Sequence, residues 1–479
     1  MLKKGIINKV FVIFFQGLAL LTLPLISKYI GSREYGIWSI IYGMMQMLVP
    51  IFILQLDSAF TRFLSGNKSL ERISNKFVSI FLLLLLIAIV VSVSFPFFDL
   101  NISNFMFASE SYVKYVYITV GWVFIRVFIN FSRNYFRTFG KFHIDTKISI
   151  AQQLTIIFSI AYVAITGKEL YDFFIIILSV EALLLLITLI LVFRELSFEK
   201  IKINIPKKYF IYAIPLVPTM ILSWVINYSD QLMIVHFSSL EENARYSLYY
   251  TYSRIPHWII ITPLNYALLP FLSKFIYSGE NISKVNNYIK ESVNISFIII
   301  STFIIGLIFY GSEILYLLSN EEVNSSSINL LMLISFSVFA TALYQIVYHI
   351  LSLKNKTGVL IYIFGLGAVI NVLFNYFTIP EYGIIGAAIS TLISFIIVGL
   401  LTCKASKLTF KEIFYPKTLV FLLFVFLGAY FVKVMFFSNL YLLGVGYVIL
   451  LIAYLGFIYK FLPSYYLFII NKLKRVIKF

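Results

Sequence analysis

The chain has 479 residues, of which 61% are hydrophobic and 12% are charged, and its net charge is +17. Soluble domains carry about a quarter charged residues, so this composition excludes an ordinary soluble protein and indicates one that spans a membrane. The single cysteine, Cys403, excludes a disulfide framework.

Long apolar segments follow one another along the chain. A membrane-spanning helix needs about 20 apolar residues. The first segment reaches that length and lacks a signal-peptide cleavage pattern, so we interpret it as a retained helix. We predict an all-α polytopic membrane protein with about fourteen spans. They cover residues 10–30, 37–61, 77–98, 112–136, 148–166, 171–193, 209–237, 246–271, 293–317, 328–352, 358–379, 382–403, 417–437 and 440–461.

The basic residues outside the spans favour alternate loops. With the N-terminus placed in the cytoplasm, lysines and arginines divide about five to one in favour of the cytoplasmic side. This asymmetry predicts a multi-pass protein of the cytoplasmic (inner) membrane with both termini in the cytoplasm. The net charge is therefore a topology signal, which anionic lipid headgroups can strengthen, and we expect no nucleic-acid partner.

The longest cytoplasmic loop, residues 194–208, is interpreted as a hinge between two halves of about six helices each. Because each half has an even number of helices, the two have the same orientation, which predicts a parallel pseudo-two-fold repeat. Similar phrases open the second span of each half, at residues 35–39 and 243–247. We predict an N-terminal lobe, a C-terminal lobe, and a pair of accessory helices with a basic tail, at residues 1–200, 201–410 and 411–479.

Prolines mark spans that we expect to bend, because proline removes a backbone hydrogen bond and kinks a helix. Gating and plain packing are both open as the role of these bends. The prolines are Pro24, Pro50, Pro215, Pro218, Pro256, Pro263 and Pro270.

A row of polar residues runs along the span at residues 112–136. Arg126 lies near its middle, where a permanent positive charge is costly unless it faces a cavity or a partner. Asn130, Arg133 and Arg137 follow at spacings of 4, 3 and 4 residues, which places all four on one helical stripe. The stripe is either a basic wall that accepts a phosphate group or a buried row of ion pairs. We predict Arg126, Asn130 and Arg133 as substrate-binding residues of a cavity, since guanidinium pairs bidentately with phosphate.

Arg254 is a further candidate for binding an anionic substrate, and four titratable residues are candidates for ion coupling or gating. Asp230 lies at a depth that overlaps Arg254, and the two form either a structural pair or a switch. Glu181 either faces Arg126 or stays protonated. The coupling or gating candidates are Asp57, Glu181, Asp230 and His257, with packing as the alternative for His257.

Four tyrosines gather where the span at residues 246–271 begins. An aromatic belt at the membrane interface is the ordinary explanation, and stacking on sugar rings is the alternative. These residues are Tyr246, Tyr249, Tyr250 and Tyr252.

The sequence lacks the motifs of cofactor and metal chemistry. It contains no G-x-x-x-x-G-K-[ST] loop, no H-E-x-x-H and no cysteine cluster. We therefore expect no cofactor and no metal. The energy for transport would come from a proton or sodium gradient, from the membrane potential or from the substrate gradient.

Several phrases resemble the polysaccharide flippases of the multidrug/oligosaccharidyl-lipid/polysaccharide exporter superfamily, which carry O-antigen or capsule repeat units. In the phrase around Asp230, Gln231 stands where the family often has arginine or lysine. The phrases are residues 24–31, 34–39, 56–63 and 228–234, and Asn371 and Asn375 followed by residues 379–391.

The resemblance implies a two-lobed bundle with a central cationic cavity and no enzyme activity. It implies alternating access that flips an undecaprenyl-pyrophosphate-linked oligosaccharide for O-antigen, lipopolysaccharide or related surface polysaccharide. The implied partners are this polyprenyl-pyrophosphate-linked oligosaccharide, membrane lipids and other polysaccharide assembly proteins. A drug or cation antiporter of the same superfamily is the alternative, which two buried arginines disfavour. A membrane polymerase or ligase of the pathway is disfavoured by the short external loops.

Overall fold

The computed structural model describes residues 25–67, 69–198, 202–265, 268, 272, 282–319, 325–354, 356, 358–435, 444–449, 451–452 and 456. Within these ranges the chain is helical, has no strand, and contains nine helices that are long and apolar enough to cross a membrane. This confirms the predicted all-α polytopic membrane protein. The predicted first and last spans, residues 10–30 and 440–461, lie largely outside the described residues.

The chain divides into two compact units, residues 1–251 with 360–394, and residues 252–359 with 395–479. The boundaries of the predicted lobes stay a prediction. In the first unit the helices are α2 (Leu25–Tyr29), α3 (Ser32–Ile53), α4 (Leu56–Leu64), α5 (Leu70–Ser94), η1 (Phe95–Phe97), α6 (Asp99–Phe107), η2 (Glu110–Tyr112), α7 (Val113–Thr138), α8 (Phe142–Thr166), α9 (Leu170–Phe193), α10 (Lys207–Ala213), α11 (Leu216–Phe237), most of α12 (Leu240–Ser253) and the first part of α16 (Val359–Ser406).

Several spans are interrupted, as the prolines predict. Pro50 precedes a break between α3 and α4, where Leu54 and Gln55 have φ of 54° and 53°. Left-handed backbone is unfavourable for residues other than glycine, so packing must hold this break in place. Within α16, Gly383 is non-helical with φ 55° and ψ −136°, and this kink separates the two predicted spans 358–379 and 382–403.

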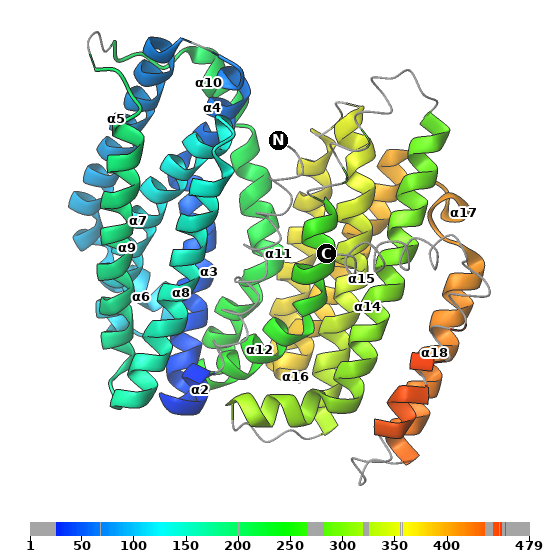
Figure 1. The fold of residues 1–479 in the computed structure, drawn as a ribbon. Coiled ribbons are helices and arrows are strands. Elements are labelled where there is room, and N and C mark those ends of the chain that lie inside the picture. Colours follow the sequence, from blue (N-terminus) through cyan, green and yellow to red (C-terminus); the bar gives the residue numbers. More distant parts are fainter. Residues whose placement is uncertain are drawn as a thin grey trace, which may run out of the picture. The chain divides into compact units, whose positions relative to one another are not determined.

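Helix α7 is the central element of the first unit, where it packs against α3, α8 and α9 (Figure 1). Aromatic rings fill the contact between these helices. The Trp38 ring centroid lies 5.4 Å from that of Trp122 on α7 and 5.2 Å from that of Phe173 on α9. All three side chains are buried. This packing fixes the middle of α7, where Arg126 lies.

In the second unit, a π-helical turn η3 (His257–Ile261) precedes α14 (Ile282–Ser319), α15 (Ser325–Leu353), the end of α16, α17 (Phe410–Ile413) and α18 (Pro416–Met435). Helix α14 packs against α15 and α18 (Figure 1). At the start of α17, Glu412 accepts hydrogen bonds from Thr409 N at 2.8 Å and from Thr409 Oγ1 at 2.7 Å. These bonds hold the pKa of the Glu412 carboxyl below its ordinary value.

Loops that the charge pattern assigns to one side of the membrane lie together within each unit. In the first unit, Lys76 donates to the carbonyl oxygen of Asn204 at 2.6 Å, and Lys141 pairs with Glu195 at 2.6 Å. In the second unit, Lys290 Nζ donates to a backbone carbonyl oxygen of the segment that follows α16, at 2.6 Å. These contacts agree with the predicted alternation of loops, while the side that faces the cytoplasm stays a prediction.

The phrases that open the second span of each predicted half contact one another. Asn243 Nδ2 donates to Ser39 Oγ at 2.8 Å and to the Gly36 carbonyl oxygen at 3.3 Å. A Cβ on Gly36 would lie 2.2 Å from the Leu240 carbonyl oxygen, so the approach requires glycine. Contact between equivalent segments is expected where a pseudo-two-fold axis passes between repeats.

The junction inside α16 generates a prediction about stability. A Cβ on Gly386 would lie 2.3 Å from the Thr378 carbonyl oxygen, whereas one on Gly121 in α7 meets open space. We expect Gly386→Ala to destabilise the protein by about 1–3 kcal/mol through overpacking. Gly121→Ala, the matched control, should be neutral or stabilising by about 0.5–1 kcal/mol. Thermal unfolding in detergent measures both, and equal melting temperatures for the two variants would contradict the close packing of the junction.

Candidate functional site

Glu181 on α9 forms a salt bridge with Arg126, which lies in the middle of α7. The Arg126 guanidinium donates through Nη2 to Glu181 Oε1, and Trp122 Nε1 donates to Glu181 Oε2 at 2.9 Å. Arg126 Cζ also lies 5.4 Å from the centre of the Trp122 ring, in cation–π contact. The first of the two alternatives for Glu181, that it faces Arg126, is therefore confirmed.

Arg133 is paired with side chains of α8. Its Nε donates to Asp145 Oδ1 at 2.8 Å and its Nη1 donates to Gln152 Oε1 at 2.9 Å. The tight turn after α7 passes through Gly140, whose φ of 74° suits glycine, and it brings the start of α8 back beside the end of α7. Asn130, between the two arginines on the stripe, is half-buried.

Asp57 lies on α4 and interacts electrostatically with Arg137 of α7. The backbone carbonyl of Asp57 accepts a hydrogen bond from Asn134 Nδ2 at 2.7 Å, and the same nitrogen donates to Thr61 Oγ1 at 3.0 Å. Asp57 Oδ1 and Arg137 Nε are both buried without a hydrogen-bond partner in the described part of the chain. The α4–α7 contact therefore joins opposite charges that are not directly bonded.

The stripe on α7 is a row of arginines faced by carboxylates from three other helices. An uncompensated arginine at the centre of a span costs about 2.5–3.5 kcal/mol on insertion scales. Arg126 and Arg133 each have a carboxylate within salt-bridge distance that compensates this charge. The geometry is that of the ion-pair row, one of the two interpretations of the stripe. Substrate binding by Arg126, Asn130 and Arg133 stays a prediction.

Asp230 on α11 is fully buried among hydroxyl groups. Its Oδ2 accepts a hydrogen bond from the Tyr246 hydroxyl of α12 and another, at 3.2 Å, from Thr391 Oγ1 of α16. Asp230 belongs to the first unit and Arg254 to the second. Their pairing, and with it the switch, stays a prediction.

The second unit holds Arg254 and His257 in a polar region of its interior. Both are buried, and Arg254 Cζ lies 5.6 Å from the centre of the Phe395 ring. His257 Nε2 donates to Gln345 Oε1 at 3.2 Å, and Asn265 Nδ2 donates to the same oxygen at 2.8 Å. This arrangement matches the packing alternative for His257, and a gating role stays a prediction.

The tyrosines at the start of the eighth predicted span do not form an interfacial belt. Tyr246, Tyr249 and Tyr252 are at most 1% exposed, and Tyr250 is 8% exposed. Side chains of a belt face the membrane interface and are exposed on the protein surface. The belt interpretation is therefore wrong, because these rings pack inside the protein and one of them binds Asp230.

Two family models match the chain. The model of the polysaccharide biosynthesis protein family matches residues 1–276, more than half of the 479 residues. The chain belongs to the polysaccharide biosynthesis protein family. The MatE model matches residues 215–377. These matches confirm the resemblance seen in the sequence.

Similar proteins cover most of the chain. An uncharacterized membrane protein of Methanocaldococcus jannaschii is 21% identical over 410 residues, which are 79% of this chain and 78% of that protein. The structure of the lipid II flippase MurJ, in an inward closed conformation, has a TM-score of 0.77 at 19% identity and covers 96% of this chain and 99% of its own.

The inward-facing structure of a multidrug transporter of the MATE family has a TM-score of 0.66 at 13% identity and covers 82% of this chain and 94% of its own. At these identities the likeness to solved structures shows the fold alone. This family member thus has the fold of flippases and transporters, and it is a multi-pass membrane protein.

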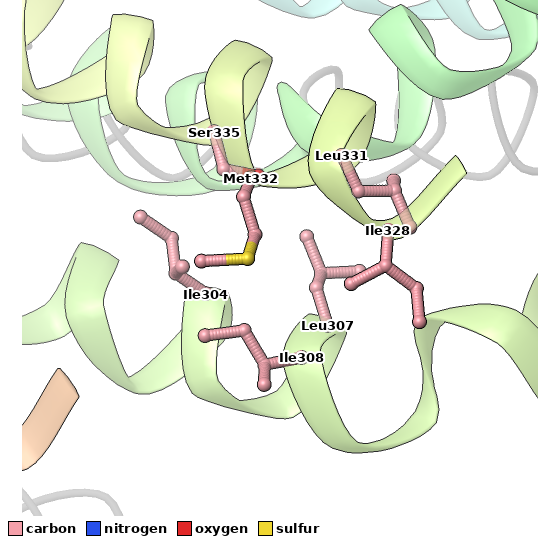
Figure 2. A pocket seen from close by; sticks show the side chains of 7 residues that line it. All are labelled: Ile304, Leu307, Ile308, Ile328, Leu331, Met332 and Ser335. Atoms are coloured by element: carbon pink, nitrogen blue, oxygen red, sulfur yellow. The ribbon is translucent and has the colours of Figure 1, made fainter. Parts of the chain in front are cut away.

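A pocket between α14 and α15 does not supply a substrate site for this family member. It is apolar and has no space for a water-sized molecule. Figure 2 shows side chains from both helices pointing into it. A diphosphate requires several donors, and Ser335 is the one lining residue here with a polar side chain. The lining residues are Ile304, Leu307, Ile308, Ile328, Leu331, Met332 and Ser335.

Sequence reasoning missed the residues that hold the arginines. Trp122 precedes Arg126 by one helical turn, so its place on the same face was visible in the sequence. Asp145 and Gln152 are spaced seven residues apart on α8, which also places them on one face, but nothing in the sequence points them at Arg133. Such partners are set by the packing of helices and not by spacing.

The Arg126–Glu181 pair generates a prediction about stability. We expect Arg126→Met and Glu181→Leu each to destabilise the protein by about 3–5 kcal/mol, because each leaves a buried charge without its partner. The double variant, which replaces both by apolar side chains, should be more stable than either single variant. Thermal unfolding of the purified protein measures all three.

The more exposed pair of Lys141 and Glu195 provides the control for this experiment. Its single and double variants should differ from the unmodified protein by no more than about 1 kcal/mol. If the losses of Arg126→Met and Glu181→Leu simply add in the double variant, the two charges are not coupled.

Proposed function

We propose that the protein flips an undecaprenyl-pyrophosphate-linked oligosaccharide repeat unit across the cytoplasmic membrane by alternating access, for the assembly of cell-surface polysaccharide. The observation that carries this proposal is a permanent cation, Arg126, held in the middle of a span. Family membership and the flippase fold support it. We place both termini in the cytoplasm on the charge pattern, and we expect other assembly proteins as partners.

Arg126 has unused capacity to bind an anion. Its Nη2 binds Glu181, whereas its Nε is buried without a hydrogen-bond partner. A guanidinium presents five donors in a fork that fits phosphate oxygens. A diphosphate entering along the stripe would therefore compete with Glu181 for Arg126, and it would meet Asn130 and Arg133 on the way.

Trp122 allows such an exchange of partners. It donates to Glu181 Oε2, while Arg126 binds the other oxygen. When a diphosphate takes Arg126, Glu181 keeps the indole N–H as a donor and is not left without a hydrogen bond. The charge of Glu181 and the occupancy of Arg126 are then linked, because each alters the free energy of the other.

A drug or cation antiporter of the same superfamily is the second candidate. The match of the MatE model to residues 215–377 favours it. Glu181 and Asp145 also favour an antiporter, because they neutralise the arginines on the stripe and so make it less attractive to an anion. Uptake assays that compare a lipid-linked oligosaccharide with cationic drugs separate the two candidates.

We further propose that a proton or sodium gradient couples to transport at Asp230. The supporting observation is its complete burial, with hydroxyl groups of α12 and α16 bonded to one carboxylate oxygen. A carboxylate shared by three helices is suited to coupling, because its charge changes how these helices pack. No cofactor is part of the proposal.

Arg126→Ala should abolish surface polysaccharide even where the protein is retained in the membrane, because the diphosphate loses its guanidinium. Staining of surface polymer and immunoblots of membranes, in a strain that lacks the native gene, measure the two quantities. The double variant Arg126→Met/Glu181→Leu should regain stability but not export. Normal surface polymer in the double variant would remove Arg126 from the mechanism.

A cation on the opposite end of α7 serves as the control for export. Lys114 lies 5.1 Å from the centre of the Tyr115 ring, near the start of the helix and away from the stripe. Lys114→Ala removes the same charge from the same helix, and we expect export to be unchanged.

Asp230→Asn should alter the dependence of transport on pH or on sodium, because the amide cannot gain or lose a charge. Transport by reconstituted protein across a series of pH values and sodium concentrations measures this. Asp172→Asn, which changes an acidic residue in the first turn of α9, is the control and should leave the profile unchanged. An unaltered profile in Asp230→Asn would exclude Asp230 as the coupling site.

A further inference from the structure

A group of basic side chains gathers at one end of the first unit, separate from the arginines that are paired with carboxylates. Arg62 lies in the last turn of α4, and Arg72 and Lys76 lie in the first turns of α5. The remaining members lie at the start of α10 and in the segment before it. We name this group the α4–α5–α10 cluster. It consists of Arg62, Arg72, Lys76, Lys202, Lys207 and Lys208.

Aromatic rings hold two of these cations in place. Arg62 Cζ lies 4.4 Å from the centre of the Tyr212 ring, and Lys208 Nζ lies 4.9 Å from the centre of the Phe63 ring. The two rings contact each other, with their centroids 6.0 Å apart. The ring contact therefore places Arg62 and Lys208 in the same small region of α4 and α10.

Hydrogen bonds to α5 position the segment before α10. Lys202 N donates to Asn75 Oδ1 at 3.0 Å and Asn204 N donates to Ser79 Oγ at 2.9 Å. In return, Lys76 Nζ donates to the Asn204 carbonyl oxygen at 2.6 Å. This part of the loop at residues 194–208 is thus fixed along α5. Its lysines therefore lie on the same side as the arginines of α4 and α5.

The cluster concentrates positive charge. Lys76 interacts with both Arg72 and Lys208 as like charges. The salt bridges of the described residues include none of the six cluster members. Glu71 is the acidic residue in the first turn of α5. Like charges that folding brings together repel each other, so a bound anion would relieve this repulsion.

We propose that the α4–α5–α10 cluster binds the phosphate headgroup of an anionic phospholipid. The cluster lies at the end of α4 and beside the starts of the candidate spans Leu70–Phe97 and Lys207–Phe237, and five of its six members are exposed. Lipid headgroups surround the ends of membrane spans. Basic residues near an anionic membrane surface contribute about 1 kcal/mol each. Two cations are already held on aromatic rings, which reduces the conformational entropy lost on binding. The proposal does not depend on the transported substrate.

Retention of lipid by the full-length protein tests this proposal. The protein is purified from vesicles of phosphatidylglycerol and phosphatidylcholine, and the retained lipids are measured by native mass spectrometry. The variant Arg62→Gln/Arg72→Gln/Lys208→Gln changes only exposed residues. We expect it to retain phosphatidylglycerol at least about tenfold less than the unmodified protein, with phosphatidylcholine unchanged.

A variant with the same loss of charge elsewhere is the control. Arg33→Gln/Lys114→Gln/Lys168→Gln removes three cations that the charge pattern assigns to the other side of the membrane. It should retain phosphatidylglycerol fully. Equal retention by the two triple variants would overturn the proposal. So would a loss of undecaprenyl pyrophosphate binding with phosphatidylglycerol retention intact, which would assign the cluster to entry of the substrate.

Export of surface polysaccharide is measured separately for the same variants. A failure of lipid binding leaves the proposed flippase function untouched, because neither triple variant changes Arg126. A failure of the flippase function leaves the lipid site equally untouched. The two proposals are therefore distinguishable by their separate measurements.

Discussion

The contact between Arg126 and Glu181 is the interaction on which the first unit depends. Arginine does not lose its proton in a protein, so a guanidinium placed in the middle of a span requires a counter-charge or water. Glu181 supplies the counter-charge, and Trp122 fixes Glu181 through its second oxygen. The indole in turn packs on Trp38 of α3. The salt bridge and the aromatic contacts beside it thereby connect α7 to both α3 and α9.

The hydropathy pattern predicted the helices well, because the length of a span is set by the thickness of the bilayer. The spacing of residues also predicted which side chains of a single helix share a face, as with Arg126, Asn130 and Arg133. Partners across helices were not predictable in the same way. Nothing in the sequence around Asp145 points to Arg133, and the tyrosines of α12 were wrongly assigned to an interface. Which face of a helix meets a neighbour depends on packing that hydropathy does not record.

Basic side chains of this protein lie in two different environments. Inside the spans, Arg126 and Arg133 each have a carboxylate within salt-bridge distance. At the start of α5, Arg72 and Lys76 lie near other cations instead. In the first arrangement each guanidinium is already paired, so the proposed diphosphate would compete with a carboxylate for it. The second favours any phosphate at the membrane surface, which suits a lasting contact with lipid.

The break at Leu54 and Gln55 has a mechanical consequence. A continuous helix transmits rotation along its whole length, but two left-handed residues interrupt the hydrogen-bonded ladder between α3 and α4. Helix α3 carries Trp38 into the aromatic core, whereas α4 is tied to α7 by the bonds of Asp57 and Thr61 with Asn134. The break therefore divides the span into one part that is held in the aromatic core and another that is held against α7, so the two parts are anchored to different neighbours.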